Sequence, residues 1–150
     1  MSSRAKAAVG EVLEVLDRLD PAERPRVVIA VNMCGRVMEY IPSCGEISTL
    51  FPVPEGLYIQ LEEIRDVGDK VMLRFRRLRL IHVHTIVEEG YYWEETRIQH
   101  IYRVEPTEEA VDVYAVRAQG GRLVPLDASQ LEQAIANVID MEYCSKLVTL

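Results

Sequence analysis

The stretch from residue 70 to residue 104 constrains the fold of this chain more than any other. It holds two long segments, KVMLRFRRLRLIHVHTIV and YYWEETRIQHIYRV, which are separated only by Glu-Glu-Gly. Both are rich in β-branched and aromatic residues, which favour extended strands, and the short break between them favours a hairpin. A long hairpin of this kind indicates that the chain contains an antiparallel sheet.

Shorter segments on both sides of the hairpin can supply these strands. Turn-forming sequences such as PVPEG, RDVGDK and QGGR separate them, and EPTEE is interpreted as a further break. The segments typical of strands are EISTLF, LYIQLEEI, AVDVYAVRA and RLVPL. Strands joined by short turns, with helices at both ends, predict an α+β fold: an antiparallel sheet with a long central hairpin, N-terminal helices and a C-terminal helix.

Helices are predicted near both ends of the chain. Apolar residues recur at spacings of three and four over residues 3–19 and over residues 127–141, which is the period of an amphipathic helix. Asp127, with Gln130 three residues on, is a typical start for the second of these helices. The residues that should face the core are Val9, Val12, Leu13, Leu16, Leu19, Leu131, Ile135, Val138 and Ile139.

Residues 26–41 fit two interpretations. A stripe of apolar residues at helical spacing favours a second N-terminal helix, for which Asp20 and Pro21 would form the start. The run Val-Val-Ile-Ala-Val also fits a buried strand. We favour the helix and keep the strand as the alternative.

The chain has the size and composition of a single domain that spans residues 1–150. Of its 150 residues 49% are hydrophobic, which is enough to bury one core. No run of about 18 apolar residues is present, so we expect no membrane span. Charged residues interrupt the apolar positions of the N-terminus, which argues against a signal peptide and favours a cytoplasmic protein.

The three cysteines, Cys34, Cys44 and Cys144, are too few and too widely spaced for a disulfide framework or a zinc site. We expect them to be reduced, buried thiols. A bridge between Cys34 and Cys44 is the alternative if the source is a hyperthermophile. The excess of arginine over lysine, 14 to 3, hints at such a habitat and at a GC-rich genome.

A two-residue turn at Glu89 and Gly90 would fix the register of the hairpin. Glu88 would then pair with Tyr91, and every later pair follows by counting. One face would present Tyr91, Trp93, His82, His84, Arg97, Arg76 and Arg103, and the core face would hold Ile81, Val83, Val87, Tyr92 and Ile98. Phe75 and Leu78 need the same side of their strand, so a bulge is expected near Arg76 and Arg77.

The composition of the hairpin favours binding of single-stranded nucleic acid. The whole chain carries a formal charge of −7, yet five basic residues and no acidic one lie from Lys70 to Ile86. Proteins that bind single strands combine cations along the phosphate path with aromatic rings that stack on bases. The candidate phosphate contacts are Arg74, Arg76, Arg77, Arg79, Arg97 and Arg103, and the candidate stacking residues are Tyr91, Trp93 and either Phe75 or Tyr102.

Two other interpretations of the hairpin stay open. Neighbouring glutamates could pair with its arginines and leave it as the interface of a structural oligomer. Alternatively His82, His84 and Glu88 form H-x-H-x-x-x-E on one strand face, which resembles the first half of the cupin motif and would hold a divalent metal. The second cupin motif is missing from the chain.

No catalytic motif stands out. The chain lacks G-x-S-x-G, a P-loop and G-x-G-x-x-G, so we expect a non-catalytic protein without a cofactor. The acidic pairs at residues 62–63 and 108–109 are expected in solvated turns.

The order of these elements resembles that of the ThermoDBP-related proteins of hyperthermophilic archaea. The matching features are the helical start RAKAAVGEVLEVLDRLDPAERP, the arginine-rich hairpin 70–104 and the terminal helix 127–141. The resemblance implies a cytoplasmic homo-oligomer in which clefts or tunnels hold single-stranded DNA, with RNA as a further ligand to consider. The terminal helix here is too short for a sustained zipper, so sheet edges or the N-terminal helices would have to join the subunits.

Overall fold

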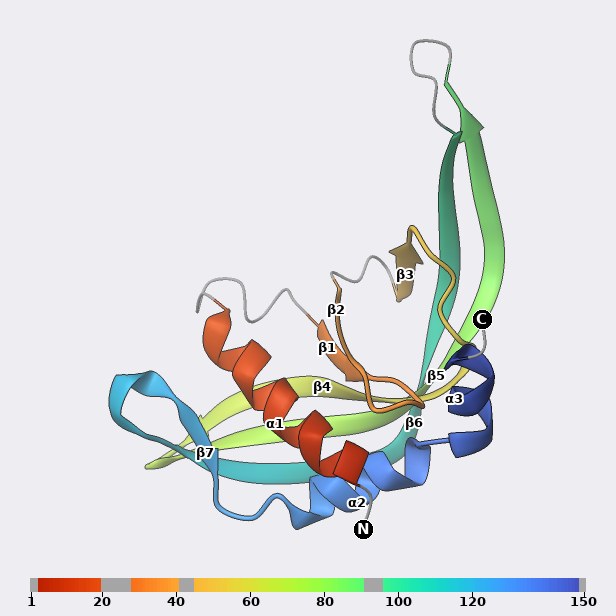
Figure 1. The fold of residues 1–150 in the computed structure, drawn as a ribbon. Coiled ribbons are helices and arrows are strands. Elements are labelled where there is room, and N and C mark those ends of the chain that lie inside the picture. Colours follow the sequence, from red (N-terminus) through yellow and green to blue (C-terminus); the bar gives the residue numbers. More distant parts are fainter. Residues whose placement is uncertain (1–2, 20–27, 41–44, 91–95, 149–150) are drawn as a thin grey trace.

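The computed structural model describes residues 3–19, 28–40, 45–90 and 96–148, and Figure 1 shows their arrangement. In chain order the helices and strands are α1 (Ser3–Arg18), β1 (Val28–Val31), β2 (Val37–Tyr40), β3 (Glu46–Thr49), β4 (Gly56–Val67), β5 (Lys70–Glu89), β6 (Thr96–Arg117), β7 (Leu123–Pro125), α2 (Ser129–Val138) and α3 (Met141–Val148). The strands form one antiparallel sheet in the order β2-β1-β4-β5-β6-β3, and β7 also pairs with β6. The α+β fold expected from the sequence, with an antiparallel sheet and a long central hairpin, is therefore confirmed.

Two parts of the sheet differ in their surroundings. The body consists of β1, β2, β4 and β7, together with residues 70–80 of β5 and 104–117 of β6. The arm consists of residues 81–89 of β5 and 96–103 of β6, and it rises away from the body in Figure 1. Strand β3 pairs with residues 100–103 of β6 and so flanks only the base of the arm.

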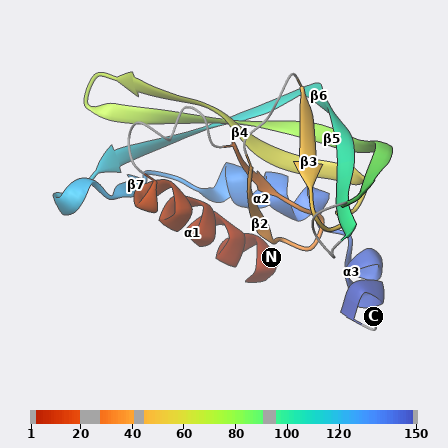
Figure 2. The same cartoon turned by 90° about the horizontal axis from the view of Figure 1, so that it is seen from above.

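The main core lies between the body and two helices. Helices α1 and α2 both cover the same face of the body, as Figures 1 and 2 show. Val12 and Leu16 of α1 and Ile135 of α2 are buried there with Leu73 and Phe75 of β5. The helix residues that were predicted to face the core do so: Val9, Val12, Leu16, Leu131, Ile135 and Val138 are buried, and Leu13, Leu19 and Ile139 are partly buried.

A second, smaller core lies on the opposite face of the sheet, where the body bends into the arm. Tyr58 pairs with Leu78 and therefore shares its face, whereas the next residue of β4, Ile59, belongs to the main core. Tyr102 completes this cluster, and its hydroxyl accepts a hydrogen bond of 2.8 Å from the Val53 backbone amide. The full set is Ala30, Ile47, Tyr58, Leu78, Leu80 and Tyr102.

The bulge expected near Arg76 and Arg77 is present. The register of β5 against β6 shifts between Arg76 and Leu78. The reason given for it is wrong, because Phe75 and Leu78 lie on opposite faces of the sheet by ordinary alternation and enter different cores. The break expected at EPTEE is wrong, because β6 runs through it as a single strand. The two extra residues of β6 are accommodated in the bulge, where the Thr107 hydroxyl donates to the Arg77 carbonyl at 2.8 Å.

The helix favoured for residues 26–41 is wrong, and the strand alternative holds for the described part, residues 28–40. β1 and β2 form an antiparallel hairpin whose turn contains Asn32 and Gly35. The Asn32 side-chain oxygen accepts hydrogen bonds from the amides of Cys34 and Arg36, and Gly35 adopts a positive φ of 75°. These turn contacts and the β-branched residues before them favour a hairpin over the helix that the apolar spacing indicated.

The C-terminal helix predicted over residues 127–141 is confirmed as α2, but it ends at Val138, and a further helix, α3, begins at Met141. Ile139 has ψ of 127°, which ends α2, and α3 follows at a new angle (Figure 1). Asp127 does accept a hydrogen bond from the Ser129 amide at 2.9 Å, and this bond lowers the pKa of its carboxyl group. It does so from the turn before the helix, because the residue at the N-cap position is Ala128.

Cys34 and Cys144 form a disulfide, so the expectation of reduced thiols at these two positions is wrong. The bond joins the β1–β2 turn to α3 across 110 residues of sequence. Sequence spacing gave no sign of it, because only the fold brings α3 beside this turn. Cys44, the partner considered for Cys34, lies outside the described residues.

Candidate nucleic-acid interface

The arm is a two-stranded ribbon over most of its length. Strand β4 stops pairing with β5 at Leu80, and β3 stops pairing with β6 at His100. Beyond these points the described residues provide no third strand. Exposed apolar side chains follow from this lack of cover: Val83, Val87 and Ile98 are 45%, 58% and 40% exposed. The expectation that these three residues belong to a core face is therefore wrong.

The register of the arm differs from the expected one. Glu89 pairs with Thr96, so the connection is longer than the two residues assumed, and the pairing of Glu88 with Tyr91 is wrong. Glu88 instead stands opposite Arg97, and Ile86 stands opposite Gln99. Because the shift of six residues is even, these residues keep the face on which they were expected. Residues 91–95, with Tyr91 and Trp93, lie outside the described part of the chain.

A second bulge in β5 separates the two histidines of the proposed metal motif. The register shifts between His82 and His84, so His82 pairs with Tyr102 whereas His84 pairs with the adjacent residue, Ile101. His82 and His84 therefore face opposite sides of the ribbon, and the expectation that His82, His84 and Glu88 share one face is wrong. Within the described residues no group of three metal-ligating side chains is found.

His82 instead lies beside His100, which was expected on the other face. The Thr85 hydroxyl joins them, at 3.0 Å from His82 Nε2 and 3.3 Å from His100 Nδ1. The His82 ring also packs edge-on against Tyr102, with ring centroids 5.3 Å apart. The hydrogen-bonded side chains of His82, Thr85 and His100 therefore lie at the base of the arm, next to the second core.

Three of the candidate arginines lie on one exposed face of the arm and its base. Ile81 pairs with Arg103, which places Arg79, two residues earlier on β5, on the same face. Arg97 lies six residues before Arg103 on β6 and so shares this face as well. Arg103 forms an ion pair with Glu105 at 2.8 Å. Arg79 forms no ion pair with any residue that the structure describes.

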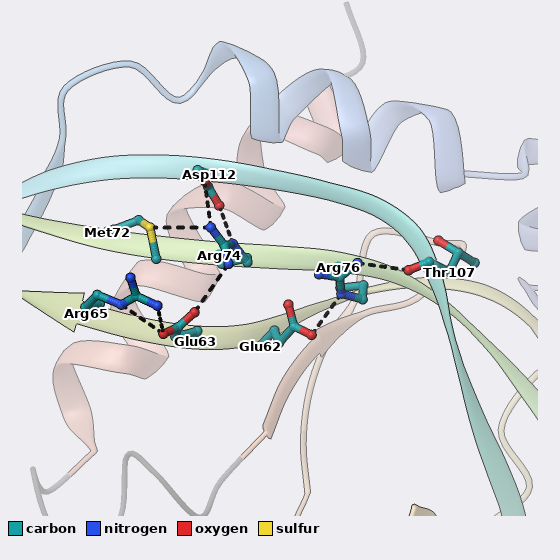
Figure 3. A network of polar contacts seen from close by, with 8 residues as sticks. All are labelled: Glu62, Glu63, Arg65, Met72, Arg74, Arg76, Thr107 and Asp112. Carbon is teal, nitrogen blue, oxygen red and sulfur yellow. Dashed lines mark hydrogen bonds and ion pairs between the residues drawn. The ribbon is translucent and has the colours of Figure 1, made fainter.

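Arg74 and Arg76 lie on the helix-free face of the body, where carboxylates hold both of them (Figure 3). The guanidinium group of Arg74 donates two hydrogen bonds to Asp112, at 2.8 and 3.2 Å, and lies 3.5 Å from Glu63. The hydrogen bonds from Arg74 lower the pKa of Asp112, and the same contact raises the pKa of Arg74. Arg76 donates a hydrogen bond to Glu62 at 2.8 Å and another to the Thr107 carbonyl at 3.0 Å. The hydrogen bond to Glu62 raises the pKa of Arg76.

Arg77 points to the other side of the body, toward α2. It pairs with Glu109 at 2.6 Å and donates to the Asn137 carbonyl at 3.4 Å. There it lines a cavity of about 350 Å³ between α2 and the sheet. The two aromatic alternatives for base stacking are also inside the protein, because Phe75 and Tyr102 are each only 2% exposed.

The structure therefore divides the nine candidate residues into four groups. Arg74, Arg76 and Arg77 are bound by carboxylates in the body, and Tyr102 is a core residue. Arg79, Arg97 and Arg103 gather on one exposed face, and Tyr91 and Trp93 lie outside the described residues.

The carboxylates are the residues that sequence reasoning missed. The acidic pair at residues 108–109 was expected in a solvated turn but lies within β6, where Glu109 pairs with Arg77. The acidic pair at residues 62–63, expected in a turn as well, lies within β4, beside Arg74 and Arg76. A signal for it exists in the sequence. Counting back from a two-residue turn at Gly68 and Asp69 places Glu63 opposite Arg74, and this is the observed pair.

Comparisons with known proteins add no identification. The chain matches no protein-family model, no curated protein and no solved structure. None of the helices that the structure describes is long and apolar enough to cross a membrane.

Proposed function

We propose that this protein is a non-catalytic binder of single-stranded nucleic acid that uses the arginine face of its arm. The observation that carries the proposal is the alignment of Arg79, Arg97 and Arg103 on one exposed face of a projecting ribbon. Contacts of this kind go to the phosphate backbone, so binding has little dependence on base sequence.

The dimensions of the ribbon suit a backbone ligand. Six residues separate Arg97 from Arg103, and a strand rises about 3.4 Å per residue, so the face extends over about 20 Å. Guanidinium groups at both ends can hold phosphates of one extended strand. The sequence places Tyr91 and Trp93 in the connection beyond Gly90, where stacking on bases would add to the phosphate contacts.

The neighbouring carboxylates limit the strength of this binding. Glu88 stands opposite Arg97 and Glu105 holds Arg103, so a phosphate must compete with a carboxylate at these two positions. We therefore expect weak binding at physiological salt, with no more than three phosphate contacts from the arginine face of each chain.

The test is a titration of a fluorescent oligo-dT with the protein at several salt concentrations, read by anisotropy. Three phosphate contacts predict a slope of about −2 in a plot of log K against log salt, since single strands release about 0.7 counterion per contact. An oligo-rU titration under the same conditions distinguishes DNA from RNA as the preferred strand. Absence of binding at low salt would overturn the proposal.

Single substitutions locate the contacts. Arg79→Ala, Arg97→Ala and Arg103→Ala should each make the slope shallower by about 0.7. Arg76→Ala is the matched control, because Glu62 and the Thr107 carbonyl already occupy that guanidinium group in the body. If Arg76→Ala changes the slope as much as the arm variants do, the body and not the arm is the binding surface.

A further inference from the structure

The outer edge of β5 in the arm is open. β4 covers this edge only as far as Leu80, and the Glu55 carboxylate then accepts a hydrogen bond of 2.6 Å from the His82 amide. From His84 to Glu89 no other strand and no side chain of the described residues covers the edge. An open edge of this length exposes unpaired amides and carbonyls and is a ready site for another strand.

The sequence of this edge is self-complementary about Ile86. His84 and Glu88 lie two residues to either side of it and share one face of the strand. Thr85 and Val87 lie one residue to either side and share the other face. A two-fold axis through Ile86 would therefore bring an imidazole opposite a carboxylate twice, and a hydroxyl-bearing β-branched residue opposite valine twice.

We propose that two copies of this chain associate through the β5 edges of their arms, antiparallel and with Ile86 on the two-fold axis. His84 then lies opposite Glu88 of the partner subunit, and Thr85 lies opposite Val87 of the partner subunit. The two hairpins become one continuous four-stranded ribbon, and its interface is the same surface patch on both copies, as a two-fold dimer requires. The partner is a second copy of this chain because the residues on either side of Ile86 are complementary when the strand pairs with itself in the antiparallel direction.

This association goes beyond the proposed nucleic-acid binding and does not depend on it. Pairing at the edge leaves both faces of the ribbon exposed, including the face with Arg79, Arg97 and Arg103. The dimer would present two such arginine sets on one surface. The mass of the protein without nucleic acid tests the association by itself.

The first experiment measures that mass by sedimentation equilibrium for the full chain, for Ile86→Arg and for Ile98→Arg. The wild-type chain should be a dimer, and Ile86→Arg should raise its dissociation constant at least about tenfold because two like charges meet on the axis. Ile98→Arg is the matched control, because Ile98 lies on β6 and away from this edge. Mixing Ile86→Arg with Ile86→Glu should restore a heterodimer. A monomeric wild-type chain, or equal effects of the two arginine variants, would overturn the proposal.

The second experiment determines the register by cross-linking, in a Cys44→Ser background that removes a competing thiol. Residues directly opposite across an antiparallel pair have Cα atoms about 4.5–5.5 Å apart, which suits a disulfide. Ile86→Cys should therefore form a covalent dimer on mild oxidation, whereas Thr85→Cys should not. The reverse result would place the axis at Thr85 and overturn the pairing proposed here.

Discussion

The body and the arm are built from the same two strands, yet their side chains have different surroundings. In the body Phe75 is buried under α1 and α2, and Arg74 is held between Asp112 and Glu63. At the end of the body Arg79 has no charged partner among the described residues, and farther along, in the arm, Val87 is 58% exposed. Strand sequence alone does not separate these cases, because arginine and β-branched residues occur in both. The difference comes from the neighbours: the body has β4 and two helices beside it, and the arm has neither.

The largest expected difference between the two regions is in their apolar side chains. Phe75→Ala should lower the free energy of unfolding by about 3–5 kcal/mol, because it leaves a cavity beneath the helices. Val87→Ala should change it by less than about 0.5 kcal/mol, because that side chain is already largely in water. Urea denaturation of the two variants measures both values. A loss above 1 kcal/mol in Val87→Ala at high dilution would mean that the isolated chain buries the arm.

The disulfide should have the next largest effect, and it acts on the body. Replacing Cys34 and Cys144 by alanine frees 110 residues of chain in the unfolded state, which should cost about 2–4 kcal/mol. Urea unfolding should shift accordingly, with the Cys44→Ser variant as the control for loss of a cysteine outside the bond. Because the disulfide joins the β1–β2 turn to α3 and neither belongs to the arm, cross-linking through Ile86→Cys should survive this change. Loss of that cross-link would show that the arm depends on the integrity of the body.

The ion pairs of the body should contribute less, and their contribution should depend on pH. The folded-state pKa of Asp112 is lowered by its hydrogen bonds from Arg74, so the pair stabilises the fold fully above the unfolded value of about 3.9. That stabilisation is lost as the pH falls through the lower, folded-state pKa. Asp112→Asn should cost at most about 1 kcal/mol at neutral pH, since the pair is partly exposed. The difference from wild type in urea denaturation should shrink toward zero in acid, and a constant difference would contradict this assignment.

Much of the fold could be predicted from the sequence because its signals are local. The amphipathic spacing of α1 reports the helix and its buried side. The β-branched run of β5 reports a strand but not its buried side, because Val83 and Val87 of the expected core face are exposed. The bulge near Arg76 was expected at the right place but for the wrong reason, since Phe75 and Leu78 are buried in different cores on opposite faces. The helix favoured for residues 26–41 failed because its apolar spacing fits two periods, and the turn at Asn32 decides between them.

The candidate site was harder to predict because it depends on register and on distant partners. The assumed two-residue turn gave the wrong pairs, and the bulge at His82 then reversed the face of one histidine relative to the other. Nothing in the local sequence marks that bulge, since His82 and His84 are equally compatible with either side. The arginines were recognised by type, but Asp112 lies 38 residues from Arg74, so the ion pair became visible only with the fold.

The smallest expected effect on stability comes from Arg79, which lies at the end of the body and shares the exposed arginine face of the arm. Arg79→Ala should leave the free energy of unfolding unchanged, because this guanidinium group is exposed and forms no ion pair within the described residues. The same substitution should weaken binding of oligo-dT and make its salt dependence shallower by about 0.7. Arg76→Ala should do the opposite, lowering stability through loss of its contacts with Glu62 and Thr107 while leaving nucleic-acid binding intact. Urea denaturation and anisotropy on both proteins give four measurements from one pair of variants. If both substitutions affect stability alone, Arg79 and Arg76 serve the same structural purpose, and the arginine face does not bind nucleic acid.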